Sequence, residues 1–281
     1  MPTTVTHSDA LFPAAKPVVA MIHVGALPGT PASRDDLRAI EARALAEAAI
    51  FRDAGVHGLM LENMHDTPYL RGGVGPEIVA ALAVIARAVK SATRLPCGVQ
   101  VLAAANREAL AVAHAAGLDF IRAEGFAFAH VADEGIIQSS AAELLRFRRQ
   151  IGAERVQVWA DVKKKHSAHA ITADVDITET AAAVEFMRGD AVIVTGSVTG
   201  KAPRPADALA VRRRCGLPLY LGSGVTTANL RKFLPVGDGF IVGSAFKEEG
   251  DWAQPVDPRR VAAFMQAHAR LTKVASEPSC A

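Results

Sequence analysis

From residue 17 onward, short apolar runs rich in β-branched residues alternate with longer, Ala-rich amphipathic runs. This alternation predicts parallel strands joined by crossover helices, because each strand returns to the sheet through a helix that covers its face. The predicted strands are residues 18–24, 58–63, 97–103, 120–125, 156–163, 191–196, 218–223 and 239–244. Eight strands that alternate with helices predict an α/β fold of the single-domain (β/α)8, or TIM-barrel, type.

Residues typical of helix ends agree with this interpretation. The polar stretch at residues 33–36 is predicted to begin the first helix, Gly55 to end it, and Gly117 to end the third. Nothing resembling a Pro-, Gly- or Ser-rich linker divides the chain. We therefore expect a peripheral N-terminal segment at residues 1–16, one barrel domain at residues 17–271 and a C-terminal tail at residues 272–281.

Composition narrows the class of protein. The 281 residues are 50% hydrophobic and carry a formal net charge of +2, which disfavours disorder and a nucleic-acid partner. The three cysteines, Cys97, Cys215 and Cys280, are widely spaced and contain no C-x-x-C pair, so a disulfide framework or zinc site is not expected. The sequence shows neither a secretory pattern nor about 20 consecutive apolar residues, so we predict a cytoplasmic protein without a membrane partner.

Glycine-containing stretches follow the seventh and eighth predicted strands, in LGSGVTT and VGSAFK. In barrels, backbone N–H groups of these two loops commonly hold a phosphate. Tight turns alone would explain one such stretch, but two at neighbouring strand ends favour an anion site. The predicted phosphate-binding residues are Gly222, Ser223, Gly224, Gly243 and Ser244. After the sixth strand, Thr195 and Gly196 are predicted substrate contacts, and Thr199 is a further candidate.

Polar residues within predicted strands are the second signal, because a barrel interior normally holds branched hydrocarbon side chains. One face of the fifth strand carries Gln157, Trp159, Asp161 and Lys163, and one face of the fourth carries Phe120, Arg122 and Glu124. Buried charges must be paired or functional. A structural ion-pair network is one interpretation, and a catalytic site is the other. The predicted catalytic residues are Asp161, Lys163, Glu124, Arg122 and Glu62.

Other strand ends supply weaker candidates. The predicted substrate contacts His23, Asn63, Asp66 and Gln100 follow the first three strands. A divalent ion such as Mg²⁺ could be held by a subset of His23, Glu62, Asp66, Glu124 and Asp161, although no H-x-H or H-E-x-x-H spacing assigns a metal. In the run of lysines at residues 163–165, strand alternation predicts that Lys163 and Lys165 share the inner face and that Lys164 points to solvent.

Together these motifs resemble the BtpA/SgcQ family. The resemblance rests on MIHVGALPG, LMLENMHDTPY, DFIRAEGFAFAHVADEG, ADVKKKH, VIVTGSVTGK, LGSGVTTANL and GFIVGSAFKEEG, in this order along nearly the whole chain. It implies a TIM barrel related to ribulose-phosphate-binding barrels and supports the phosphate interpretation. Many family members carry Asn and Asp after the third strand, where this chain has alanines at residues 103–105. The family takes its name from a proposed role in photosystem I biogenesis.

Three functions follow as hypotheses. The first is an enzyme that acts on a small phosphorylated sugar or nucleotide-like metabolite by acid–base chemistry, as an isomerase, a lyase or a glycosidic-bond-cleaving enzyme. Asp161 or Glu124 would be the base, Lys163 the acid or an electrostatic stabiliser, and Arg122 and Asn63 would position the substrate. The second is a non-enzymatic assembly or stability factor that binds a protein partner. The third is a metal-dependent phosphohydrolase. Ala-rich outer helices also predict a homo-oligomer.

Overall fold

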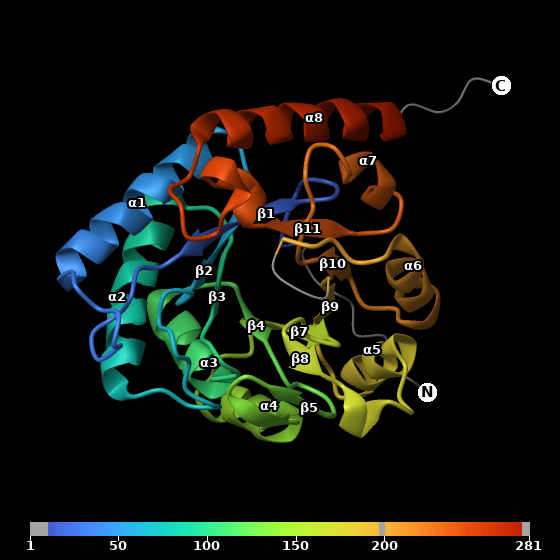
Figure 1. The fold of residues 1–281 in the computed structure, drawn as a ribbon, viewed down its shortest axis with the longest axis horizontal. Helices are drawn as coiled ribbons and strands as arrows, with labels where there is room; N and C mark the ends of the chain where they lie inside the picture. The colour runs from blue at the N-terminus through green and yellow to red at the C-terminus, as the bar shows by residue number, and fades with distance from the viewer. Residues whose placement is uncertain (1–10, 197–199, 277–281) are drawn as a thin grey trace.

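The eight predicted strands form one closed parallel barrel in the computed structural model, which describes residues 11–196 and 200–276 (Figure 1). Around the barrel the strand order is β1-β11-β10-β9-β7-β4-β3-β2. The prediction of a single-domain TIM barrel is confirmed. The barrel strands are β1 (Val18–His23), β2 (Gly58–Glu62), β3 (Cys97–Gln100), β4 (Phe120–Ala123), β7 (Gln157–Val162), β9 (Ala191–Val194), β10 (Leu219–Leu221) and β11 (Gly239–Val242).

Helices surround the strands (Figure 1). They are α1 (Leu37–Asp53), α2 (Pro76–Thr93), α3 (Asn106–Ala116), α4 (Ala141–Gln150), α5 (Ile177–Phe186), α6 (Pro205–Arg214), α7 (Leu230–Phe233) and α8 (Pro258–Ser276). Asp36 caps α1 by accepting a hydrogen bond from the backbone N–H of Ala39, and Gly117 ends α3 with a φ of 75°. Both ends lie where the sequence predicts them, whereas α8 continues beyond residue 271. Among the helices described, none has the length and apolar composition needed to cross a membrane.

A small antiparallel sheet lies outside the barrel and was not predicted from the sequence. Its strands, in the order β6-β5-β8, come from the loops after β4 and β7: β5 (Ala129–Ala132), β6 (Gly135–Gln138) and β8 (Ser167–Ala168). Strands of two to four residues carry too short an alternation to be recognised. Short 3-10 segments complete the loops, namely η1 (Ala170–Thr172), η2 (Ser244–Phe246) and η3 (Glu248–Gly250).

Stacked aromatic rings fill the floor of the barrel. The ring of Trp159 stacks between those of Phe120 and Tyr220, with ring centroids 3.8 and 4.1 Å away. Phe12 closes the floor from below, with its ring centroid 6.2 Å from that of Trp159, and only 6% of it is exposed. The stretch that includes Phe12 was expected to be peripheral, but part of it contributes to the core. Packing under the barrel removes the apolar surface of this aromatic ring from water, which favours its position there.

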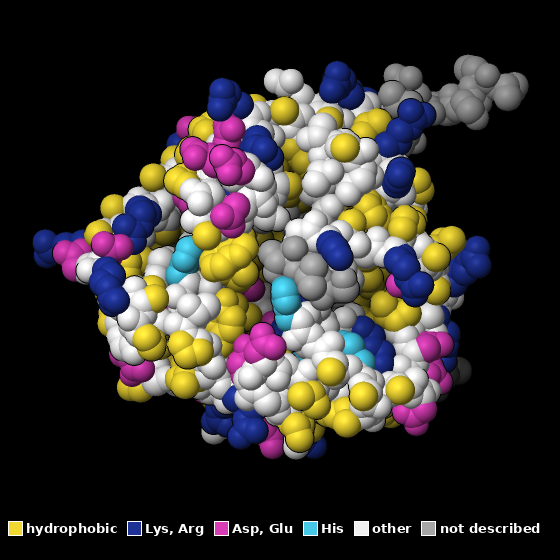
Figure 2. Space-filling view, in the orientation of Figure 1, with side chains coloured by type: hydrophobic (Ala, Val, Ile, Leu, Met, Phe, Trp, Pro, Cys, Tyr) yellow, Lys and Arg dark blue, Asp and Glu magenta, His cyan; other side chains and the backbone are white. Residues whose placement is uncertain are grey.

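The barrel interior changes from apolar to polar along the strands. Above the aromatic floor, the inward positions are apolar, among them Met21, Met60, Ile193 and Ile241. The next inward residues are His23, Glu62, Gln100, Arg122 and Asp161, with Glu124 just beyond the end of β4, and the register pairs His23 with Glu62 and Glu62 with Gln100. The carboxyl ends of the strands therefore carry the chemistry, as in other TIM barrels. Figure 2 shows this face of the molecule, with histidine and acidic side chains beside apolar ones near its centre.

Gly98 makes room for the floor, because a Cβ atom there would lie 2.2 Å from the ring of Phe120. We expect Gly98→Ala to lower the free energy of unfolding by about 1–3 kcal/mol through overpacking, measured by urea denaturation. Gly73→Ala is the matched control, since its Cβ would meet only Glu108 Oε1 at 3.6 Å. Equal stability of Gly98→Ala and the wild type would contradict this account of the floor.

Candidate active site

A buried ion pair joins two neighbouring strands at the barrel mouth. Arg122 on β4 donates to Asp161 on β7 from two nitrogens, with Nη2–Oδ1 at 3.0 Å and Nε–Oδ2 at 3.1 Å. Their side chains are only 3% and 0% exposed. Desolvating two charges is unfavourable unless their geometry is good and their polar atoms are satisfied, and the double contact meets that requirement. The pair therefore holds the Arg122 guanidinium in one orientation at the mouth.

Glu124 forms the second buried pair. Its Oε2 lies 3.1 Å from Lys164 Nζ and accepts a hydrogen bond from the backbone N–H of Ala104, while its Oε1 accepts one from Gln100 Nε2 at 2.8 Å. Burial raises the pKa of Glu124, and the nearby charge of Lys164 only partly opposes this shift. A carboxyl with a raised pKa suits acid–base catalysis, because it can take up and release a proton nearer neutral pH.

The predicted orientation of the three lysines is wrong. Lys163 has a left-handed backbone conformation, with a φ of 53°, which ends the period-two alternation of the strand. Its Nζ donates to the backbone oxygen of Thr172 at 3.0 Å. Lys164, expected in solvent, is instead buried against Glu124. Lys165 lies near the mouth, where burial and then the charge of Arg122 lower its pKa. Lys164 and Lys165 therefore lie near the charged residues of the mouth, the position that the sequence analysis predicted for Lys163.

His23 contributes a neutral imidazole. Its Nδ1 lies 3.0 Å from the backbone oxygen of Trp252, and because a carbonyl only accepts, Nδ1 carries the proton and donates. Nε2 then presents a lone pair 4.0 Å from Glu62 Oε2. Burial, followed by the charge of Lys247, lowers the pKa of His23 to about 3. Near neutral pH, His23 is therefore a hydrogen-bond acceptor at the mouth.

The predicted substrate contacts Asn63 and Asp66 hold loops together. Asn63 Nδ2 donates to Asp66 Oδ2 at 2.9 Å, and Asn63 Oδ1 accepts from the backbone N–H of Leu102. Asp66 Oδ1 also accepts from the backbone N–H of Leu27 at 2.7 Å. These contacts tie together the loops after β1, β2 and β3. Gln100 Oε1 and Thr195 Oγ1, in contrast, are buried polar atoms that have no hydrogen-bond partner among the described residues.

Residues 11–196 and 200–276 contain no preformed metal site, because no three His, Cys, Asp or Glu side chains among them come close enough to bind one ion. Three of the four carboxylates proposed from the sequence have other partners, and the fourth, Glu62, lies 4.0 Å from His23. Glu124 pairs with Lys164, Asp161 with Arg122, and Asp66 with backbone N–H groups.

A second feature is a cavity of about 380 Å³ at the ends of β10 and β11. It brings together two of the predicted phosphate-binding residues, Gly224 and Ser244. The sequence reasoning missed the other polar residues of its lining, Thr226, Thr227 and Arg260. The signal that could have revealed Arg260 is its position in VDPRR, at the start of the last predicted helix. We call this space the phosphate cavity, after the prediction that Gly224 and Ser244 bind phosphate.

The other predicted phosphate and loop residues lie outside this cavity. A Cβ at Gly222 would lie 2.5 Å from Ile193 Cγ2, and one at Gly243 would lie 3.2 Å from His23 Nε2. These two glycines therefore give space to neighbouring side chains. Ser223 is buried, and a Cβ at Gly196 would lie 2.0 Å from the backbone oxygen of Lys201. Thr199 falls outside the described residues.

The closed barrel with a charged carboxyl-end layer defines a TIM barrel of the kind that enzymes use. The chain belongs to the BtpA family, whose family model matches residues 14–270. It is 46% identical to an uncharacterized mitochondrial protein of Caenorhabditis elegans, over 91% of this chain and 94% of that protein. It is 33% identical to the photosystem I biogenesis protein BtpA of a Synechocystis species, over 95% and 92%.

Solved structures confirm the fold. Orotidine 5′-monophosphate decarboxylase from Methanocaldococcus jannaschii superposes with a TM-score of 0.56 at 12% identity, over 90% of this chain and 98% of that chain. N-(5′-phosphoribosyl)anthranilate isomerase from Pyrococcus furiosus gives a TM-score of 0.52 at 14% identity, over 91% and 99%. At these identities the likeness shows a shared barrel and no shared activity.

The Arg122–Asp161 pair generates the second prediction. Arg122→Met should cost about 3–5 kcal/mol of stability, because it leaves the Asp161 carboxylate buried without a partner. The double variant Arg122→Met/Asp161→Leu should lose less than the two single changes combined. Urea denaturation measures all three, with Arg204→Ala in the exposed Arg204–Asp207 pair as a control that should barely change stability. Additive losses in the double variant would contradict a coupled pair.

The lowered pKa of His23 generates the third prediction. Because the folded value is about 3 and the ordinary value 6.5, the unfolded chain binds more protons between these pH values. The contribution of neutral His23 to the free energy of unfolding is therefore complete above pH 6.5. It is lost as the pH falls, by about 2 kcal/mol at pH 5, because protonation of the unfolded chain favours unfolding. Urea denaturation at pH 8 and pH 5 should show a smaller loss of stability in His23→Gln than in the wild type. The same loss in both proteins would refute a neutral, buried His23.

Proposed function

We propose that this protein is a phosphate-binding TIM-barrel enzyme that acts on a small phosphorylated sugar or nucleotide-like metabolite by acid–base chemistry. Isomerisation, lyase chemistry and glycosidic-bond cleavage are the reactions that such a site can perform. The observation that carries the proposal is the buried ionisable layer at the barrel mouth. A passive scaffold would fill these positions with hydrocarbon at lower free energy, so the charges favour a catalytic role.

The phosphate cavity supports the anchoring step. In the part of the chain that the structure describes, the backbone N–H groups of Gly224 and Ser244 donate no hydrogen bond to a backbone oxygen, which supports a role in binding a ligand. The hydroxyls of Thr226 and Thr227 and the guanidinium of Arg260 share the same cavity. Such donors suit a phosphate, and arginine can bind two of its oxygens at once. Both barrel enzymes compared above are named for phosphorylated compounds.

The buried charge pairs support a specific role for each side chain at the mouth. Glu124, whose pKa is raised, is the general acid or base, and Lys164 is the cation that stabilises its charged form. Asp161 is less suited to accept a proton, because Arg122 occupies both of its oxygens; it positions Arg122 instead. His23 Nε2, Gln100 Oε1 and Thr195 Oγ1 are acceptors that can orient substrate hydroxyl groups.

A protein-binding assembly role is the second candidate, suggested by the name of the Synechocystis relative. One observation favours it. Large apolar side chains of the outer sheet and its neighbouring loop are exposed, at 38% for Phe128, 50% for Ile136 and 55% for Ile171. Exposed apolar groups of this kind can serve as an interaction surface. Cytoplasmic location and homo-oligomer formation remain predictions.

The proposal predicts stabilisation by phosphorylated ligands. We expect ribose 5-phosphate, glucose 6-phosphate or a nucleoside monophosphate to raise the Tm, since a ligand at one hundred times its Kd adds about 2.7 kcal/mol to stability. Arg260→Ala should weaken this effect, measured by thermal shift. Arg259→Ala is the matched control, because Arg259 is adjacent and pairs with Asp257, as Arg260 does at 4.0 Å, but does not line the cavity.

Two results would overturn this proposal: no phosphorylated compound raises the Tm, or Arg260→Ala responds like the wild type. Stabilisation that requires added Mg²⁺ would instead favour the metal-dependent phosphohydrolase. A substitution at Gly224 is avoided, because a Cβ there would lie 2.1 Å from the backbone nitrogen of Ala202 and would disturb the loop itself.

A further inference from the structure

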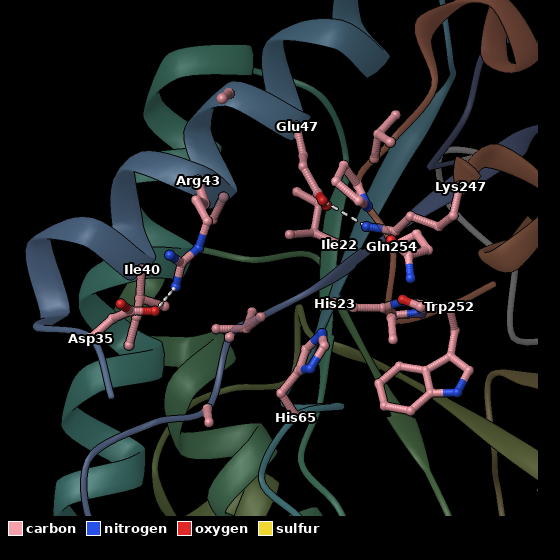
Figure 3. Close-up of a pocket in the computed structure, with 18 of the residues that line it drawn as sticks. Ile22, His23, Asp35, Ile40, Arg43, Glu47, His65, Lys247, Trp252 and Gln254 are labelled. Atoms are coloured by element: carbon pink, nitrogen blue, oxygen red, sulfur yellow. Dashed lines mark hydrogen bonds and ion pairs between the residues drawn. The ribbon is translucent and has the colours of Figure 1, made fainter. Parts of the chain in front are cut away.

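A second cavity, of about 590 Å³, lies between α1 and the segment that joins β11 to α8 (Figure 3). We call it the α1 cavity. Its volume falls within the range of sites for small molecules. Ile40 and Ile50 of α1, with Val256 opposite, give it an apolar floor. Apart from His23, no residue of this cavity has a role in the function proposed above.

Aromatic rings form one wall of the α1 cavity. The rings of His65 and Trp252 have centroids 5.0 Å apart and are tilted by 48°. His23 meets Trp252 edge-on, with ring centroids 6.2 Å apart. Figure 3 shows these three side chains together on the side facing α1. Burial lowers the pKa of His65 as it does that of His23, so both rings are uncharged at neutral pH. The wall can therefore stack a planar, neutral ring.

Polar groups complete the cavity on the α1 side. Lys247, only 2% exposed, pairs with Glu47 of α1 at 2.6 Å. Arg43, also on α1, pairs with Asp35 at 2.6 Å, and this pair is about half exposed. Figure 3 shows Arg43 and Glu47 pointing from α1 toward the cavity. Hydrogen-bond donors and acceptors thus surround an apolar floor and an aromatic wall.

His23 connects the α1 cavity with the barrel mouth. It lines the cavity, and its Nε2 lies 4.0 Å from Glu62 Oε2 of the mouth layer. A ligand group in the cavity therefore lies next to His23, to which substrate orientation is assigned, and His23 in turn lies near Glu62 of the mouth.

These features select one class of ligand. A hydrocarbon chain would leave Glu47 Oε2 unsatisfied, a buried atom that has no hydrogen-bond partner among the described residues, and a sugar phosphate would leave the apolar floor and aromatic wall unused. A nitrogen heterocycle has apolar faces and hydrogen-bonding edges, which match both. We propose that the α1 cavity binds the heterocyclic base of a nucleotide-like substrate. This inference rests on the proposed function and narrows its substrate class from sugar phosphates to compounds that carry a base.

Tryptophan fluorescence tests the inference directly. The chain has two tryptophans, Trp159 in the barrel floor and Trp252 in the cavity wall, so the variant Trp159→Phe leaves Trp252 as the only emitter. We expect adenosine or uridine, which lack a phosphate, to change its emission saturably, and ribose 5-phosphate to leave it unchanged.

Two substitutions on α1 locate the binding. Ala46 lines the cavity and Ala42 does not, although both are exposed residues of the same helix. Ala46→Phe should weaken nucleoside binding by about tenfold or more, whereas Ala42→Phe should not. Trp252→Leu, measured by calorimetry, should also weaken it without altering the thermal shift caused by ribose 5-phosphate.

The outcomes separate this inference from the proposed function. If ribose 5-phosphate stabilises the protein through Arg260 but no nucleoside changes Trp252 emission, the base-binding inference fails and the enzyme proposal stands. If nucleosides bind at Trp252 while no phosphorylated compound stabilises the protein, the enzyme proposal fails and the α1 cavity remains a site for a heterocycle. Equal nucleoside affinity in Ala46→Phe and Ala42→Phe would also overturn the inference.

Discussion

The buried pair of Arg122 and Asp161 is the constraint on which the rest of the mouth depends. Both charges lie out of solvent, so each needs the other, and their contact fixes β4 against β7 in one register. The same register places Glu124 beside Asp161 on the inner face. Because that layer is charged, the stability of the barrel must come from elsewhere, namely the stacked aromatic floor and the apolar layer between the strands and the helices.

The division into an apolar floor and a charged mouth explains where ligands can bind. The segment that follows β11 lines two spaces: the phosphate cavity beside α8 and the α1 cavity beside α1. His23 lines the α1 cavity, and a Cβ at Gly243 would approach its Nε2 to 3.2 Å. A substrate with a phosphate at one end and a ring at the other would place its reacting centre between the two cavities, at the mouth. Membership of the BtpA family is compatible with this arrangement and assigns no reaction.

Much of the fold and of the candidate site could be predicted from the sequence, because these features depend on local patterns. Strand periodicity gave the number, order and inner faces of the barrel strands, and the polar residues on those faces identified Arg122, Glu124 and Asp161. The prediction failed where the pattern ended. Lys163 leaves the strand with a positive φ, which reverses the orientation of the lysines that follow, and period-two reasoning has no means to detect such a turn.

The sequence by itself thus determined the barrel, its charged layer and the family, since each rests on spacing along the chain. Only the tertiary structure decided which side chains distant in the sequence come into contact. Arg260 reaches the phosphate cavity from a helix more than thirty residues after Gly224, and Trp252 meets His65, which precedes it by 187 residues in the sequence. Phe12 likewise packs under a barrel that it precedes. Such contacts depend on closure of the barrel, which brings its first and last strands together, and no local pattern encodes which side chains then meet.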